Sequence, residues 1–112
     1  MRRDRETIST DHLGLRARRD EDSLELVLAG DLDMTAAFKV EPAFDHLVAE
    51  GDVRELVLDV GDVEFIDSAG LGALLSIRDR TQQLGIEMRL VNVPRPVRRI
   101  LDLSGTSVLL PD

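Results

Sequence analysis

The alternation of apolar and polar residues near the start of the chain predicts a β-hairpin. Leucine or alanine occupies every second position over 13–18, and leucine does so over 24–29. This is the period of strands with one buried face. The polar segment 19–23 between them predicts a turn, so we expect the two strands to pair antiparallel. Residues 1–11 are polar and mixed in charge, which predicts a flexible tail.

A helix is expected next, over about 34–50, with Gly51 ending it. Asp33 or Thr35 can cap its N-terminus. Pro42 predicts either a kink near residue 40 or a helix that begins only at residue 41 or 42, because proline removes a helix hydrogen bond. The inward-facing side chains are expected to be Phe38, Phe44, Leu47 and Val48.

The remaining pattern predicts further helices and strands in alternation. They are a strand over 55–60, a turn at 61–62, a helix over 68–84 that Gly85 ends, a strand over 86–91, a helix that Pro96 opens and Gly105 ends, and a strand over 108–110. The order β-β-α-β-α-β-α-β predicts an α/β fold. Its helices pack on a mostly parallel sheet of four to five strands that opens with a hairpin.

The stretch 63–75, VEFIDSAGLGALL, joins an apolar run to the start of the 68–84 helix. Asp67 and Ser68 are both residue types that cap a helix N-terminus, where N–H groups and the helix dipole favour negative charge. Gly70 and Gly72 fall in the first turns, and each costs a helix about 1 kcal/mol relative to alanine. Two such glycines predict close packing against this backbone, either by the rest of the fold or by a partner.

Charge and composition narrow the possible partners. The net charge of −8 and the pI near 4.7 argue against nucleic acid or an anionic membrane. The absence of cysteine excludes disulfides and thiolate metal sites, and the sequence predicts no metal and no cofactor. The chain contains neither an apolar run long enough to span a membrane nor the apolar region of a secretory signal. We therefore expect a cytoplasmic protein.

Ser68 is the residue with the most chemical possibilities. As a hydrolase nucleophile it would need a base, and the only histidines are His12 and His46. The residues around it also lack the G-x-S-x-G pattern. As a phosphate acceptor it would gain nearly two negative charges at a helix N-terminus. This charge would lower the affinity of a partner that covers the surface, through repulsion and desolvation. On chemistry alone, a simple capping role stays open beside this one.

The octapeptide Phe65–Gly72, FIDSAGLG, resembles the signature of STAS domains, specifically the bacterial anti-sigma-factor antagonists. Supporting matches are GDLD at 30–33, LVLD at 56–59 and VRRILDLSG at 97–105, and the resemblance covers about residues 12–110. It implies a STAS domain over 12–112 that lacks the family's usual C-terminal helix. It also implies that Ser68 is phosphorylated by an anti-sigma factor that is a serine kinase, and that a phosphatase removes the phosphate.

In this interpretation the protein is a regulator of transcription, for example in a stress response, and not an enzyme. The unphosphorylated form binds the anti-sigma factor and releases the sigma factor. The resemblance places the partner-binding residues at Asp31, Asp33, Asp67, Ser68, Ala69, Gly70, Leu71 and Gly72. It is also compatible with a weak homodimer. The alternative is a STAS scaffold subunit of a larger signalling complex, without direct control of a sigma factor.

Overall fold

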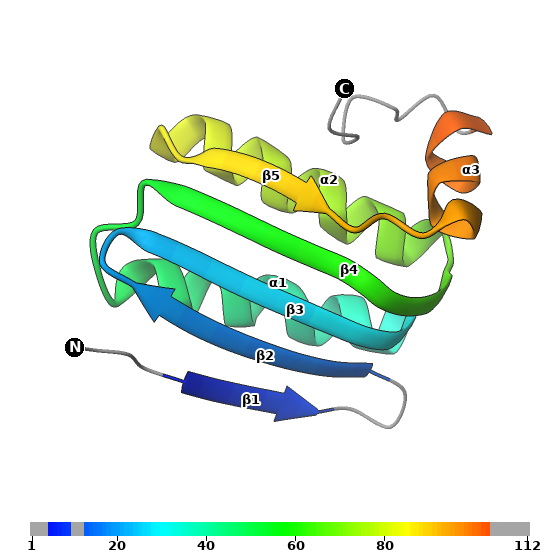
Figure 1. Ribbon diagram of the computed structural model, residues 1–112, viewed down its shortest axis with the longest axis horizontal. Coiled ribbons are helices and arrows are strands. Elements are labelled where there is room, and N and C mark those ends of the chain that lie inside the picture. The colour runs from blue at the N-terminus through cyan, green and yellow to red at the C-terminus, as the bar shows by residue number, and fades with distance from the viewer. Residues whose placement is uncertain (1–4, 10–12, 104–112) are drawn as a thin grey trace.

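Five strands form one sheet, in the order β1-β2-β3-β4-β5, within the residues that the computed structural model describes, 5–9 and 13–103 (Figure 1). In chain order the elements are β1 (Arg5–Ser9), β2 (Leu13–Asp20), β3 (Ser23–Leu32), α1 (Met34–Ala49), β4 (Glu55–Ile66), α2 (Ser68–Leu84), β5 (Glu87–Val91) and α3 (Arg95–Leu103). The expected end of the last helix at Gly105 and the expected strand over 108–110 lie outside the described residues.

The predicted hairpin and the parallel part of the sheet are both confirmed. β2 and β3 pair antiparallel around a tight turn, where Asp20 lies opposite Ser23 and Glu21 has a φ of 56°. β3 pairs parallel with β4, and β4 pairs parallel with β5. The connections between these parallel strands are α1 and α2, as an α/β fold requires.

The prediction of a flexible tail over 1–11 is wrong for Arg5–Ser9, because this segment is β1. It pairs antiparallel with β2 along the whole of its length, from Arg5 opposite Arg18 to Ser9 opposite Gly14. The free edge of β2 offers a row of backbone donors and acceptors, and pairing with them needs no apolar side chain. A polar segment can therefore become an edge strand without any sign of it in the hydrophobic pattern.

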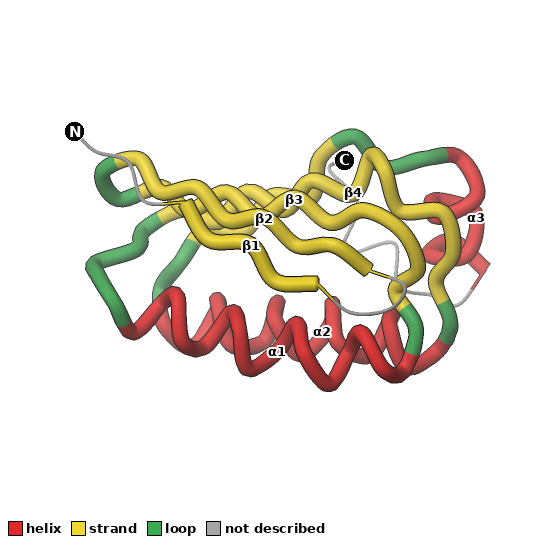
Figure 2. Tube along the Cα trace, turned by 90° about the horizontal axis from the view of Figure 1, so that it is seen from below, coloured by secondary structure: helices red, strands yellow, loops and turns green. Residues whose placement is uncertain are grey.

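Helices α1 and α2 lie side by side under one face of the sheet (Figure 2). The strand residues that point toward them are apolar and almost fully buried. They include Leu15, Leu24, Leu26, Leu28, Leu56, Leu58 and Leu90. Helix α3 lies near the carboxyl-terminal end of β4, and its residues Val97 and Leu101 are buried (Figure 1). Most of the core is therefore one layer of apolar side chains between the sheet and the parallel helices α1 and α2, and this layer includes the aromatic side chain of Phe44.

The turn expected at Gly61–Asp62 is absent, and β4 runs without a break from Glu55 to Ile66. Its pairing with β3 shifts register twice, once after Asp59 and once after Val63, so β4 contains two extra residues relative to β3. These are the features of β-bulges, which bend a strand without ending it. The backbone N–H of Gly61 donates to the Asp59 carboxylate at 2.9 Å. Gly61 and Asp62 therefore mark a bend within β4 and not a turn that ends it.

Helix α1 begins at Met34 and is continuous through Pro42 to Ala49, so the later starts expected at residue 41 or 42 are wrong. Burial of one face against the sheet stabilises a helix more than one missing hydrogen bond destabilises it. Phe44 and Leu47 are buried, and Val48 is half-buried against the core, as predicted. Phe38, however, is 72% exposed, so its predicted inward position is wrong. Its place is taken by Ala36 and Val40, which complete the buried stripe.

Candidate functional site

The N-termini of α1 and α2 lie next to each other, at the carboxyl ends of the parallel strands β3 and β4. The backbone N–H of Asp67 donates to the carbonyl of Leu32, the last residue of β3, at 3.3 Å. The two helices then run in the same direction, since Ser76 bonds Glu41 and Arg80 bonds Asp45, each pair 35 residues apart in the chain. Ligands of parallel α/β sheets usually bind beyond the carboxyl ends of the strands.

Aspartates cap both helices in the same way. Oδ1 of Asp33 accepts from the N–H of Ala36 at 3.0 Å, and Oδ1 of Asp67 accepts from the N–H of Gly70 at 2.9 Å. Both aspartates have extended backbones, as N-cap residues do. Ser68 is therefore the first residue of α2 and not its cap, and it is exposed. Because Asp67 makes the capping bond, the Ser68 hydroxyl is not needed for it.

We expect Asp67→Ala to lower the free energy of unfolding by about 1 kcal/mol, because the N–H of Gly70 loses its acceptor. Chemical denaturation of the purified variant measures this change. The matched control is Asp79→Ala, which removes an exposed carboxylate from α2 far from its N-terminus. Equal stability of the two variants would show that the Asp67 cap does not stabilise the helix.

The structure places the eight expected partner-binding residues in two groups. Ser68 and Gly72 are exposed, and Asp31, Asp33, Asp67 and Ala69 are half-buried. Gly70 is buried, and a Cβ there would lie 2.0 Å from the carbonyl oxygen of Leu32. Leu71 packs partly buried against the core. Gly70 and Leu71 thus hold α2 against the rest of the fold, whereas the other six form the accessible surface.

The sequence interpretation missed an apolar surface on α1 beside Ser68. Met34 and Phe38 are 59% and 72% exposed, and Pro42 is exposed one further turn along. Together with Ala69 of α2 they line a groove of about 470 Å³, which we call the α1 groove. Its far end is formed by Glu41 and Asp45, which both pair with Arg80. The four-residue spacing of Met34, Phe38 and Pro42 was the available signal, since it places them on one face.

The structure separates Ser68 from the histidine that it describes. His46 is exposed near the C-terminal end of α1, where Nε2 lies 3.1 Å from a carboxylate oxygen of Glu50. The rise of the helix between this residue and Met34, at the end of α1 that adjoins Ser68, is about 18 Å. His12 lies outside the described residues. Within 13–103, then, no histidine is within reach of Ser68 to act as a base.

Two further findings on the described part of the chain concern metal sites and membrane-spanning helices. It contains no group of three or more His, Cys, Asp or Glu side chains placed to hold a metal ion. None of its helices combines the length and apolar character needed to cross a membrane.

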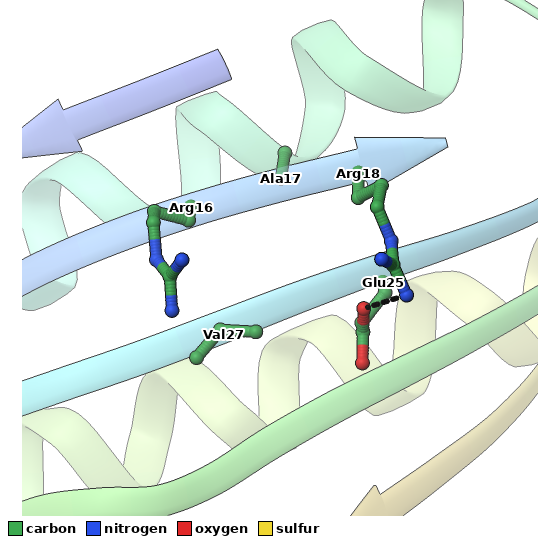
Figure 3. Close-up of a pocket in the computed structure, with 5 residues that line it drawn as sticks. All are labelled: Arg16, Ala17, Arg18, Glu25 and Val27. Atoms are coloured by element: carbon green, nitrogen blue, oxygen red, sulfur yellow. Dashed lines mark ion pairs between the residues drawn. The ribbon is translucent and has the colours of Figure 1, made fainter. Parts of the chain in front are cut away.

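The sheet face opposite α1 and α2 has a separate hollow of about 200 Å³ (Figure 3). Arg16 and Arg18 of β2 and Glu25 of β3 reach over it, and Arg18 pairs with Glu25 at 3.1 Å. This hollow lies on the other side of the sheet from the two helices, so it is distinct from the Ser68 surface.

Known proteins are similar to this chain in sequence and in fold. The family model of the STAS domain matches residues 15–110. The anti-sigma F factor antagonist of Paenibacillus polymyxa is 33% identical over 84 residues, which are 75% of this chain and 72% of that protein.

Two solved structures have the same fold at lower identity. One is the anti-sigma factor antagonist SpoIIAA in its unphosphorylated form, with a TM-score of 0.76 at 20% identity over 88% of this chain and 86% of that one. The other is an anti-sigma factor antagonist from Mycobacterium paratuberculosis, with a TM-score of 0.77 at 24% identity over 92% and 86%.

Proposed function

The chain belongs to the STAS domain family, and we propose that it is an anti-sigma factor antagonist that phosphorylation of Ser68 switches off. In its unphosphorylated form it binds a cognate anti-sigma factor and thereby releases the sigma factor. The anti-sigma factor is also the serine kinase that modifies Ser68, and a phosphoserine phosphatase restores the active form. Relatives that are named as anti-sigma factor antagonists support the first part of this proposal.

The observation that carries the proposal is the position of the Ser68 hydroxyl. Ser68 is exposed at the first position of α2, while Asp67 satisfies the cap. A partner can therefore reach the hydroxyl without opening the fold. Two helix N-termini meet at this place, and their dipoles favour the negative charge that a phosphate brings. The modified protein can consequently remain folded.

The chemistry of the switch belongs to the kinase. The Ser68 Oγ attacks the γ-phosphorus of ATP, an Oγ–P bond forms, and the bond from that phosphorus to the β–γ bridging oxygen breaks. ADP leaves with the bridging oxygen, and the hydroxyl proton passes to a base of the kinase. The antagonist contributes an oriented hydroxyl and no catalytic group, so it acts by binding and not as an enzyme.

The same step explains why the complex would dissociate. Directly after transfer, phosphoserine carries nearly two negative charges and lies next to the phosphates of ADP. Asp67 precedes it in the chain, and Asp33 caps the neighbouring helix. Like charges held together in a closed interface repel and lose their hydration. The phosphorylated surface is thus expected to bind the kinase weakly, while it is well accommodated in water.

Incubation with ATP and the anti-sigma kinases of the same cell tests the proposal. We expect one phosphate per chain by intact mass, mapped to Ser68 by peptide sequencing, and none on a Ser68→Ala variant. The variant should still bind the kinase, because the hydroxyl is the acceptor and not the main contact. Failure of every kinase to modify a folded wild-type chain would favour a STAS scaffold subunit, or an antagonist that works without phosphorylation.

A further inference from the structure

An interface centred on Ser68 must extend beyond the partner-binding residues that the sequence predicts. Stable protein complexes bury about 800 Å² on each partner, from about 20 to 30 residues. The accessible residues among those expected from the sequence are six, at the end of β3 and around the N-termini of α1 and α2. A kinase that holds Ser68 must therefore cover neighbouring surface as well.

The α1 groove is an apolar surface continuous with Ser68. Ala69, which lines the groove, is the residue after Ser68, and Met34, which opens it, is the residue after the Asp33 cap. Phe38 is 72% exposed, although phenylalanine is a residue that proteins usually bury. Aromatic residues, phenylalanine included, are enriched in protein interfaces relative to the rest of the surface.

The shape and charge of the groove indicate what it binds. Met34, Phe38 and Pro42 recur every four residues, so they form a stripe of about 12 Å along α1, which matches two turns of a partner helix. At the far end, two carboxylates, Glu41 and Asp45, share the single guanidinium of Arg80 and leave one net negative charge. The chain as a whole carries −8. A partner segment with Lys or Arg beside its apolar anchor is complementary to this surface.

We propose that the α1 groove docks a helix of the anti-sigma factor that presents an apolar side chain flanked by Lys or Arg, and that Phe38 is the main apolar contact of this groove. This inference rests on the proposed function. It adds a second contact, whose residues are not themselves modified by phosphorylation. Ser68 then carries the phosphorylation state, while Phe38 contributes binding free energy in both states.

Phe38→Ser tests the apolar contact, with Leu103→Ser as its matched control. Leu103 is also an exposed large apolar residue, at 80%, but it lies at the end of α3. Calorimetric titration with the anti-sigma factor that binds wild type should show Phe38→Ser binding at least ten-fold more weakly. Leu103→Ser should bind within two-fold of wild type, and neither variant should lose melting temperature, because both side chains are exposed.

Asp45→Lys tests the charge complementarity, with Asp102→Lys as its control. Both aspartates are exposed, one in the groove and one on α3. We expect Asp45→Lys to weaken binding several-fold more at low salt than at high salt, because salt screens the repulsion. The Asp102 variant should show no such difference.

The outcomes separate the two proposals. If wild type binds the anti-sigma factor and both Phe38→Ser and Leu103→Ser bind it with the same affinity, the groove proposal is wrong. The proposed function would still stand. If Phe38→Ser instead changed the chain from dimer to monomer in sedimentation while anti-sigma binding stayed the same, the groove would be a homodimer surface and the proposal wrong. A wild-type chain that binds no anti-sigma factor overturns the proposed function, and the groove proposal with it.

Discussion

Ser68→Asp is expected to weaken binding to the anti-sigma factor by a factor of about a hundred to a thousand. In the proposed switch, the carboxylate would place a permanent negative charge where the kinase holds the phosphates of its nucleotide. Two unit charges about 4 Å apart repel by about 4 kcal/mol at an effective dielectric constant near 20. Since each 1.4 kcal/mol is a factor of ten in affinity, this repulsion accounts for the expected loss. Titration with the nucleotide-bound kinase measures it.

Ser68→Asn is the matched control, because it has nearly the size of aspartate without its charge. It should retain most of the affinity if charge is the cause. The fold should not suffer in either variant, since Ser68 is exposed and an acidic residue in the first turn of a helix stabilises it by about 0.3 to 1 kcal/mol. An aspartate variant that binds as tightly as wild type would contradict a charge-operated switch, and equal losses in both variants would point to steric exclusion.

Gly70→Ala is expected to destabilise the whole domain by about 3 kcal/mol or more. An alanine Cβ at this position would lie 2.0 Å from the carbonyl oxygen of Leu32 and 2.9 Å from the carbonyl carbon. Backbone atoms cannot rotate away as the end of a side chain can, so α2 must move off β3. Overpacking inside a fold typically costs 1–3 kcal/mol, and a backbone clash lies at or above the top of that range. We expect the melting temperature to fall by about 10 °C or more.

Gly72→Ala provides a control with the same chemical change two residues further along α2. Nothing lies within 4 Å of the Cβ that this substitution would add, and the residue is exposed. Alanine is favoured over glycine in a helix by about 1 kcal/mol, so this variant should be more stable than wild type. Opposite signs for the two glycines, measured by thermal denaturation, would establish Gly70 as a packing residue. Similar changes at both positions would refute the close contact with Leu32.

The same pair of variants separates folding from binding. Gly70→Ala should weaken anti-sigma binding only as far as it lowers the folded fraction, because Gly70 is buried. Gly72 stays on the accessible surface, so a methyl group there can obstruct a partner while the fold gains stability. A loss of affinity in a more stable Gly72 variant would place this residue in the interface.

Several features of the fold could be predicted because neighbouring residues along the chain determine them. The period of two over 13–18 and 24–29 identified the hairpin, because alternate side chains of a strand face the same side. The bounds of α2 followed from Asp67 and Ser68, two adjacent residue types that cap a helix, and from Gly85, which adopts the left-handed conformation that ends it. Only the structure showed that Asp67 is the one that caps. The resemblance of residues 65–72 to the STAS signature indicated the family and the position of Ser68.

Other features depended on segments that are distant in the sequence. The polar segment Arg5–Ser9 became a strand because the edge of β2 was free to pair with it. Phe38 had the hydrophobicity of a core residue, but the orientation of α1 on the sheet buried Ala36 and Val40 in its place. The sequence could not show whether Gly70 allows close packing by the rest of the fold or by a partner. The group that packs against it is the carbonyl of Leu32, which lies at the end of β3 and is distant in the sequence.

The sequence by itself therefore determined the order of most elements, the bounds of α2, the family, and the serine at the start of that helix. Periodicity, capping and signature motifs are local, and a chain carries them whatever its final packing. Only the tertiary structure decided which glycine is internal, which residues of α1 are exposed, and that Met34, Phe38 and Pro42 lie beside Ser68. These are relations between surfaces, and they exist only once parallel strands have brought the N-termini of two helices together.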